Sequence, residues 1–198
     1  MTQSFDILIV GVGGQGTILA SNVLGGACLI EGRTVRGAET HGMAQRGGSV
    51  ESHIRIDGKF GPLIAPGTAD LLIAFDMIEA LRYRHYLRDG GTLIMNTAII
   101  VPTSAFQQEL PIPSPEEIIE RLGDCAICRI DAAGIAIEAG NVLAQNIVML
   151  GAASHLIPLK VTSLKEAVAA NVPPKTIELN VAAFEKGRAA GEECTGTG

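Results

Sequence analysis

Positive charge is scarce in this sequence. Its 198 residues include 15 lysines and arginines against 21 aspartates and glutamates, which gives a formal net charge of −6. A protein that binds nucleic acid without sequence preference needs a basic face to displace counterions from the phosphates. We therefore expect no nucleic acid partner, and predict that the chain binds a small ligand or another protein.

Long uncharged apolar runs are missing too. None approaches the roughly 18 residues that a membrane-spanning helix needs. The N-terminus also lacks the charged, apolar and small-residue segments that make up a signal peptide. The sequence therefore predicts a cytoplasmic protein with no membrane partner. At 198 residues with 47% apolar side chains, the chain is long enough to fill one core and short for two.

Cysteine is too sparse for a disulfide scaffold, because there are only four in the chain. Cys125 and Cys128 form a CxxC pair, but the surrounding "CAICRID" is typical of a buried strand, in which residues three apart point to opposite faces. We interpret them as core thiols and not as a metal or redox pair. Cys28 lies on the apolar side of a helix and Cys194 in a polar tail, and neither has neighbours at metal-ligand spacing.

Apolar strands that alternate with helices are what the sequence does contain. Continuous apolar runs predict buried strands, and apolar residues spaced three and four apart predict helices. This alternation indicates a single α/β domain with a doubly wound, mostly parallel sheet covered by helices on both faces, a Rossmann-like fold. We place the domain at residues 1–188 and a flexible tail at 189–198. The predicted strands include 4–11, 69–75 and 91–96, and the predicted helices include 15–30, 77–87 and one capped at Ser114 with Glu117 three residues on.

The stretch "GSVESHIRIDG" (48–58) has the alternation of a strand with one wet face. Asp57 and Gly58 then predict a turn, and a hairpin with the following "KFGPLI". In this pattern four residues point to the core and three point to water: Val50, Ser52, Ile54 and Ile56 inward, and Glu51, His53 and Arg55 outward.

A glycine-rich turn, "GVGGQG" (11–16), directly follows the first predicted strand and opens the first helix. Gly11, Gly13 and Gly16 fit the GxGxxG pattern of dinucleotide-binding folds, and the helix N-terminus offers N–H groups to an anion. That pattern also needs an acidic residue at the end of the second strand. The chain has Arg33 and Arg36 there, and Glu39 comes late. A tight turn that only allows close packing therefore remains an alternative to nucleotide binding.

Four stretches in sequence point to one family. They are "GVGGQG", "GAETHGMAQRGGSVESHIRI", "ADLLIAFDMIEALRYRHYLRDGGTLIMNT" and "AGNVLAQNIVMLGA". Together they resemble the gamma-type module of the 2-oxoacid:ferredoxin oxidoreductases, and within that family the beta subunit of the indolepyruvate branch. The resemblance extends over residues 4–188.

This resemblance implies a reaction shared between subunits. Thiamine diphosphate attacks a 2-oxoacid, carbon dioxide leaves, iron-sulfur clusters pass electrons to ferredoxin, and coenzyme A takes the acyl group. In the indolepyruvate branch, aryl pyruvates become arylacetyl-CoA. This chain lacks both the GDG and Asn-Asn signature of thiamine enzymes and the repeated cysteines of a cluster-binding segment. Thiamine diphosphate, magnesium and 4Fe-4S clusters are therefore expected in a larger alpha subunit, with coenzyme A as co-substrate. We expect no catalytic residue, no metal ligand and no activity from this chain alone.

The resemblance also suggests a role for the polar segment "RGAETHGMAQRGGSV" (36–50). A loop so rich in glycine loses much backbone entropy when it becomes ordered, so we predict that it meets a partner subunit or lines a ligand site. A merely solvated connector is the alternative. The candidate binding or interface residues are Gly11, Gly13, Gly14, Gln15 and Gly16 in the turn, and Glu39, His41, Gly42, Gln45, Arg46, Gly47 and Gly48 in the loop.

Two further residues are candidates for binding a ligand. Asp76 follows a predicted parallel strand, where open α/β sheets bind ligands, but it also suits the N-cap of the next helix. Asn146 either binds a ligand or satisfies a buried backbone group. Two other functions remain open: a stand-alone NAD(P)-dependent oxidoreductase, and a non-enzymatic assembly module.

Overall fold

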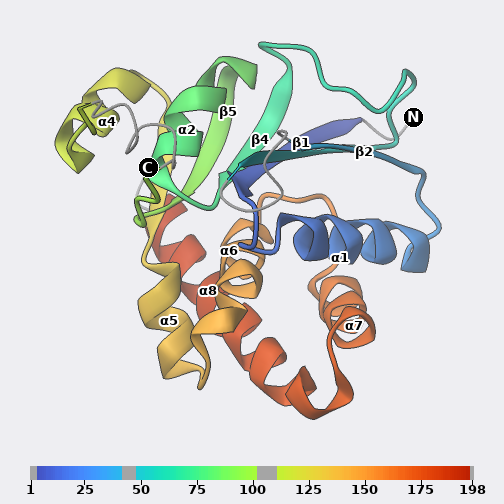
Figure 1. The fold of residues 1–198 in the computed structure, drawn as a ribbon. Helices are drawn as coiled ribbons and strands as arrows, with labels where there is room; N and C mark the ends of the chain where they lie inside the picture. The colour runs from blue at the N-terminus through green and yellow to red at the C-terminus, as the bar shows by residue number, and fades with distance from the viewer. Residues whose placement is uncertain (1–3, 42–47, 102–110, 197–198) are drawn as a thin grey trace.

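A single six-stranded sheet forms the centre of the molecule (Figure 1). The computed structural model describes residues 4–41, 48–101 and 111–196. The strands lie in the order β2-β3-β1-β4-β5-β6. Their bounds are β1 Phe5–Val12, β2 Val35–His41, β3 Ser49–Ile56, β4 Ala69–Ala74, β5 Leu87–Asn96 and β6 Ala126–Ile130.

Four of the strands form a parallel half. β1 pairs with β4, β4 with β5 and β5 with β6, all in parallel. Ile7 to Val10 of β1 are completely buried, as expected for a strand covered on both faces. The predicted doubly wound α/β fold with a mostly parallel sheet is therefore confirmed.

Helices cover both faces of this sheet (Figure 1). One face packs against α2 (Met77–Tyr83) and α4 (Pro115–Leu122). The other face is covered by α1 (Thr17–Ile30), α6 (Gln145–Ala153) and α8 (Ile177–Thr195). Behind these helices, α7 (Val161–Asn171) packs against α1 and α8, and α5 (Ala132–Glu138) packs against α6 and α8. Short 3-10 turns are η1 (Arg84–Tyr86), η2 (Val142–Ala144) and η3 (Pro174–Thr176). The capping box predicted at Ser114 and Glu117 is present.

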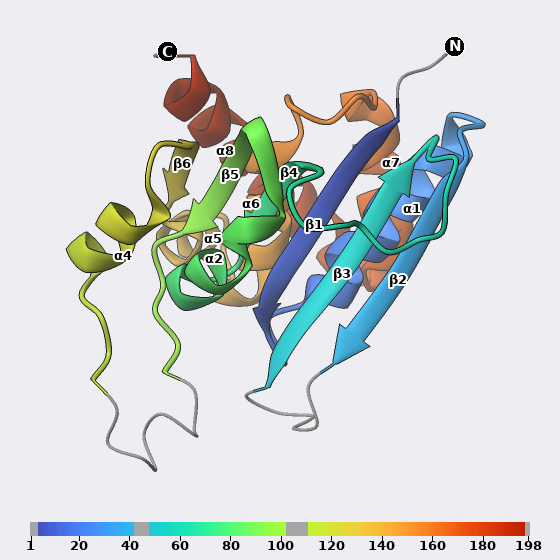
Figure 2. The ribbon, with the colours of Figure 1, turned by 90° about the horizontal axis from the view of Figure 1, so that it is seen from above.

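The antiparallel half of the sheet corrects two predictions. Residues 36–41 belong to strand β2 and residues 49–50 to strand β3, so the prediction of a loop is wrong for these residues. β3 pairs antiparallel with both β2 and β1, and not with the "KFGPLI" segment. Figure 2 shows β2, β3 and β1 side by side, with β3 running opposite to its neighbours. The register explains the difference, since every residue of β2 finds a backbone partner on β3.

The prediction that His53 of β3 faces water is wrong, because its side chain is buried. Its ring nitrogen Nδ1 accepts a hydrogen bond from the backbone N–H of Ile64 at 3.1 Å, and its ring meets Tyr86 edge-on. The segment that follows β3 thus folds back over this face of the sheet. Burial lowers the pKa of His53, more than the nearby Glu51 carboxylate raises it.

The contact between α6 and α8 is the most extensive one between two helices in the described chain. Glycine makes it close: a Cβ on Gly151 would overlap the backbone carbonyl of Phe184, and one on Gly187 would overlap that of Val148. Gly191 lies equally close to Ala152. Backbone meets backbone here, so neither helix can move without breaking the packing.

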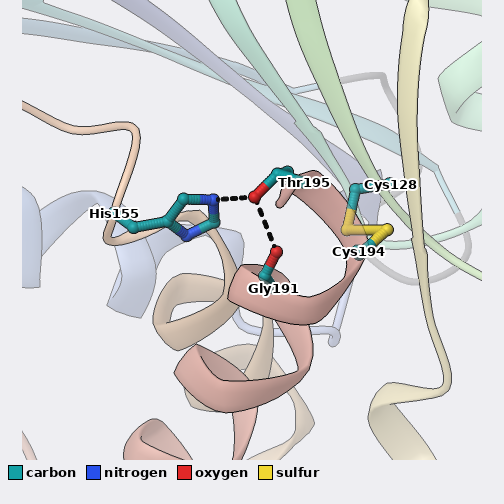
Figure 3. Close-up of a disulfide and its surroundings, with 5 residues drawn as sticks. All are labelled: Cys128, His155, Gly191, Cys194 and Thr195. Carbon is teal, nitrogen blue, oxygen red and sulfur yellow. Dashed lines mark hydrogen bonds between the residues drawn. A yellow bond between two sulfur atoms is a disulfide. The ribbon is translucent and has the colours of Figure 1, made fainter. Parts of the chain in front are cut away.

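The C-terminal end is ordered further than the sequence indicates. α8 continues to Thr195, so a flexible tail from residue 189 is wrong for residues 189–195. Cys194, near the end of this helix, forms a disulfide with Cys128 of β6 (Figure 3). Cys128 is buried as predicted, but it is not a free thiol. The free cysteines are Cys28 and Cys125.

Within residues 4–41, 48–101 and 111–196, no helix has the length and apolar character that crossing a membrane requires.

Candidate functional site

The candidate site lies at the carboxyl edge of the parallel strands. β1 is followed by α1 on one face of the sheet, whereas β4 is followed by α2 on the opposite face. The ends of two adjacent parallel strands whose connections diverge form the crevice where open α/β sheets bind ligands. The glycine turn at 11–16 and Asp76 both lie at this point.

The glycine turn is built around Gln15. Its Oε1 accepts a hydrogen bond from the backbone N–H of Val12 at 2.7 Å, and its Nε2 donates to the carbonyl of Phe75 at 2.9 Å. Gln15 therefore ties the end of β1 to the end of β4. Both ends of the Gln15 amide are therefore occupied by backbone groups of the protein. For this residue, the contacts support the alternative in which the turn serves packing.

Gly16 opens α1 in the left-handed conformation, with φ 84°. A Cβ at this position would overlap the side-chain amide of Asn146 on α6. Asn146 is buried, and its Oδ1 accepts from the N–H of Ile147 at 2.9 Å. The third glycine of the motif thus permits α1 to approach α6. Asn146 satisfies a buried backbone group, which is one of the two roles predicted for it.

Asn96, at the end of β5, joins the same network. It was not among the site residues predicted from the sequence. Its Nδ2 donates to the Phe75 carbonyl at 3.1 Å, and its Oδ1 accepts from the N–H of Ala132 at 3.2 Å. One carbonyl at the end of β4 therefore receives amide N–H groups from Gln15 and Asn96. The sequence signal that could have identified Asn96 is its position as a polar residue directly after the strand-forming run "TLIM".

Asp76 is the N-cap of α2, as one of its two alternatives predicted. Its Oδ1 accepts from the N–H groups of Ile78 and Glu79 at 2.9 and 3.0 Å. Its Oδ2 is buried and has no hydrogen-bond partner. Burial raises the pKa of the Asp76 carboxyl to about 6, and the neighbouring Glu79 adds to the rise. The site therefore contains a carboxyl group that titrates close to neutrality.

A second polar group connects α2 to the start of β3. Glu79 is only 2% exposed and accepts a hydrogen bond from the hydroxyl of Ser49. Ser49 also lies 3.0 Å from the Tyr83 hydroxyl, and Glu79 pairs with Arg82 at 3.2 Å. Sequence reasoning missed this group, because Ser49 and Glu79 are far apart in the chain.

The two glycine-rich segments meet directly. The N–H of Gly13 donates to the carbonyl of Gly48 at 2.9 Å. Glu39 lies on β2, where it accepts from the Ser21 hydroxyl of α1 at 3.0 Å. His41 ends β2. The remaining loop candidates, Gly42, Gln45, Arg46 and Gly47, lie outside the described residues.

Among the residues that the structure describes, no acidic residue occupies the position that would bind a ribose at this edge. In dinucleotide-binding folds the strand beside β1 runs parallel to it and ends in an acidic residue. Here that place is taken by β3, which runs antiparallel and starts at this edge with Ser49. β2 lies one strand further out.

Metal ligands do not cluster in the part of the chain that the structure describes. No group of three or more histidine, cysteine, aspartate or glutamate side chains there could hold a metal ion.

In the described residues, this is a doubly wound α/β fold with a glycine turn at its switch point and no acidic residue in the position that would bind a ribose. Residues 6–190 match the model of the pyruvate ferredoxin/flavodoxin oxidoreductase family. The chain belongs to this family, so the resemblance seen in its sequence motifs is confirmed.

Individual relatives agree with this assignment. Indolepyruvate oxidoreductase subunit IorB of Pyrococcus horikoshii is 40% identical over 197 residues, which cover 96% of this chain and 98% of the relative. 2-Oxoglutarate synthase subunit KorC of Methanothermobacter marburgensis is 31% identical over 92% of this chain and 94% of its own. Among solved structures, the keto/oxoacid ferredoxin oxidoreductase gamma subunit of Geobacter sulfurreducens superimposes with a TM-score of 0.73 at 26% identity, covering 96% of this chain and 99% of that one.

Proposed function

We propose that this chain is the non-cofactor subunit of an indolepyruvate-type 2-oxoacid:ferredoxin oxidoreductase of the cytoplasm. The observation that carries this proposal is the 40% identity to an indolepyruvate oxidoreductase subunit over almost the full length of both chains. The assembled enzyme would convert an aryl pyruvate and coenzyme A into arylacetyl-CoA and carbon dioxide. The two electrons released would reduce two molecules of ferredoxin.

The cofactors belong to the partner in this proposal. A larger alpha subunit would hold thiamine diphosphate, magnesium and 4Fe-4S clusters, and would pass electrons to ferredoxin. The cysteine inventory of this chain supports that division, because Cys128 and Cys194 are bonded to each other and Cys28 is buried. The pKa of the Cys28 thiol is raised by its burial to about 11, which makes it a poor cluster ligand.

The carboxyl edge of the sheet is the surface that would face the partner. The Gly13–Gly48 hydrogen bond fixes one end of the loop at the glycine turn. Large apolar side chains stand exposed at the nearby corner between α5 and α6, where Ile137 is 64% and Leu143 is 78% exposed. Asn141 holds this corner by accepting from the N–H of Leu143 at 2.9 Å. An exposed apolar corner beside a polar network suits a protein interface.

The loop candidates complete the proposed contact surface. His41, Gln45 and Arg46 would reach the partner or an anionic group of coenzyme A, since an arginine binds phosphate well. The buried Asp76 and Glu79 would not touch the partner. They would support the contact surface by holding α2 and the start of β3 in place.

Anaerobic reconstitution tests the proposal. The chain is mixed with the large subunit encoded beside it, and indolepyruvate- and coenzyme A-dependent reduction of ferredoxin or a viologen dye is followed. We expect activity only when both chains are present. Activity of the large chain alone would contradict the proposal, and saturable NAD(P) binding by this chain would favour the nucleotide-dependent alternative. If the chains form a complex that stays inactive with several 2-oxoacids, the assembly-module alternative holds.

The loop is tested by Arg46→Ala. We expect a loss of turnover or of assembly of about tenfold or more, because one charge-assisted contact contributes roughly 1.5–3 kcal/mol. The melting temperature of the isolated chain should stay unchanged. Arg121→Ala, which removes an exposed arginine on α4, is the matched control. A large fall in the melting temperature for Arg46→Ala would instead give this residue a structural role.

A further inference from the structure

The disulfide between Cys128 and Cys194 joins β6 to the end of α8, two elements that also pack against each other. Cys128 lies on β6, an edge strand of the sheet, and Cys194 lies in the last turn of α8, 66 residues later (Figure 3). Their Cα atoms are 5.5 Å apart, within the usual range for a disulfide. The bond therefore fastens the end of the chain to the sheet.

The last turn of α8 lies beyond the glycines that hold the helix directly against α6. Up to Gly191 the helix backbone lies directly against α6. Beyond it, Glu192 and Glu193 are exposed, whereas Cys194 and Thr195 are half-buried. Thr195 provides one further attachment: its hydroxyl donates to the Gly191 carbonyl at 2.8 Å and so accepts from Nε2 of His155 at 2.6 Å (Figure 3).

A cavity of about 370 Å³ gives access to the disulfide. Both cysteines line it, together with Leu156 and Thr195. Cys128 is 1% exposed, so Cys194 is the sulfur that a thiol approaching from solvent would reach first. Exchange of a disulfide requires such access for the attacking thiolate.

We propose that Cys128 and Cys194 form a reversible, redox-responsive clasp on the C-terminal turn of α8, which takes low-molecular-weight thiols as its reductant. A small thiol releases its proton to solvent, and its thiolate attacks Sγ of Cys194. The bond between the two protein sulfurs breaks, and Cys128 leaves as a thiolate that takes up a proton from solvent. A second thiolate attacks the mixed disulfide, which releases a small-molecule disulfide, and Cys194 is protonated in turn. Two thiols are oxidised and one protein disulfide is reduced to two thiols.

The clasp releases only a short segment. The glycine contacts of α8 with α6 end at Gly191, and they do not depend on the disulfide. Reduction therefore loosens residues 192–195 and opens the cavity beside β6, while the domain stays folded. Local opening of a terminal segment with few buried contacts costs little free energy, which makes such a segment suitable as a switch.

Alkylation and hydrogen exchange on the full chain test this proposal. Air-oxidised and dithiothreitol-reduced protein are treated with iodoacetamide under native conditions, and the peptides are analysed by mass spectrometry. We expect Cys194 to be labelled only after reduction. Backbone amides of residues 192–195 should then exchange about tenfold faster or more, with protection elsewhere unchanged.

Three variants separate the clasp from a general loss of structure. Cys194→Ser and Cys128→Ser should show fast exchange at residues 192–195 whether or not reductant is present. Cys125→Ser removes a free cysteine that takes no part in the bond, so it should respond to reductant as the natural sequence does. Stoichiometric labelling of Cys194 before reduction, or equal exchange in the oxidised and reduced protein, would overturn the proposal.

Discussion

The α6–α8 contact and the carboxyl edge of the sheet differ in the kind of group that each one buries. Between α6 and α8, glycines bring two backbones into direct contact among fully buried apolar side chains. At the carboxyl edge, Asn96 and Asp76 place an amide and a carboxyl group where water is largely excluded, beside the half-buried amide of Gln15. Buried polar groups cost free energy unless each is fully hydrogen-bonded, and Oδ2 of Asp76 has no partner. The first region therefore contributes close backbone packing, while the second retains a buried carboxyl oxygen that stability alone would not select.

The largest effect is expected from Gly187→Ala on α8. The new Cβ would overlap the backbone carbonyl of Val148, which cannot move without shifting α6. We expect the free energy of unfolding in urea to fall by about 3 kcal/mol. Gly25→Ala on α1 is the control, because nothing lies within 4 Å of its new Cβ. That variant should gain up to about 1 kcal/mol from helix propensity. Equal effects of the two substitutions would contradict the prediction that the close α6–α8 contact makes Gly187→Ala costly.

A smaller loss is expected from Gly16→Ala at the edge of the sheet. Its φ of 84° is unfavourable for alanine, and the Cβ would also push against Asn146. We expect a loss of about 2 kcal/mol in urea unfolding. Gly14→Ala has a φ of 106° but open space around the new Cβ, so only the backbone cost of roughly 1 kcal/mol applies. If Gly14→Ala proves as costly as Gly16→Ala, the contact with Asn146 contributes nothing.

Asp76→Asn is expected to have a smaller effect than Gly187→Ala and Gly16→Ala, and an effect of opposite sign. The folded pKa of Asp76 is raised from 3.8 to about 6, so the folded state binds this proton more tightly than the unfolded state. Its contribution to stability is complete below pH 3.8 and is lost as the pH rises through about 6. Asparagine keeps the cap through its Oδ1 and cannot ionise.

We therefore expect Asp76→Asn to be more stable than the natural sequence by about 1–2 kcal/mol at pH 7. The full effect of the pKa shift is not expected, because the new amide N–H₂ group needs a partner in the place of Oδ2. The decline in stability between pH 4 and 6 should flatten. Urea titrations across this range measure it, and a variant that is less stable at pH 7 would show that the charge itself supports the fold.

Local patterns determined which parts of this molecule could be predicted from sequence. The parallel half follows from continuous apolar runs, and the glycine turn from a motif at the end of a strand. The β2 sequence "VRGAETH" has few strand-forming residues, and its conformation depends on pairing with β3. His53 is buried by a segment that folds back over it.

The same distinction applies to the candidate site. Asp76 could be identified because its cap is local. The contacts of Ser49 with Glu79 and of Cys128 with Cys194 could not, since they join positions 30 and 66 residues apart.

The place of β3 between β1 and β2 limits how this scaffold could be re-engineered. Nicotinamide specificity in many enzymes is altered by replacing one residue at the end of the second strand. Here that strand lies two positions from the glycine turn, a displacement of about 10 Å at the usual spacing between strands. A carboxylate introduced at the end of β2 would therefore not reach a ribose held at Gly13, and grafting nucleotide dependence onto this fold would require removing a strand.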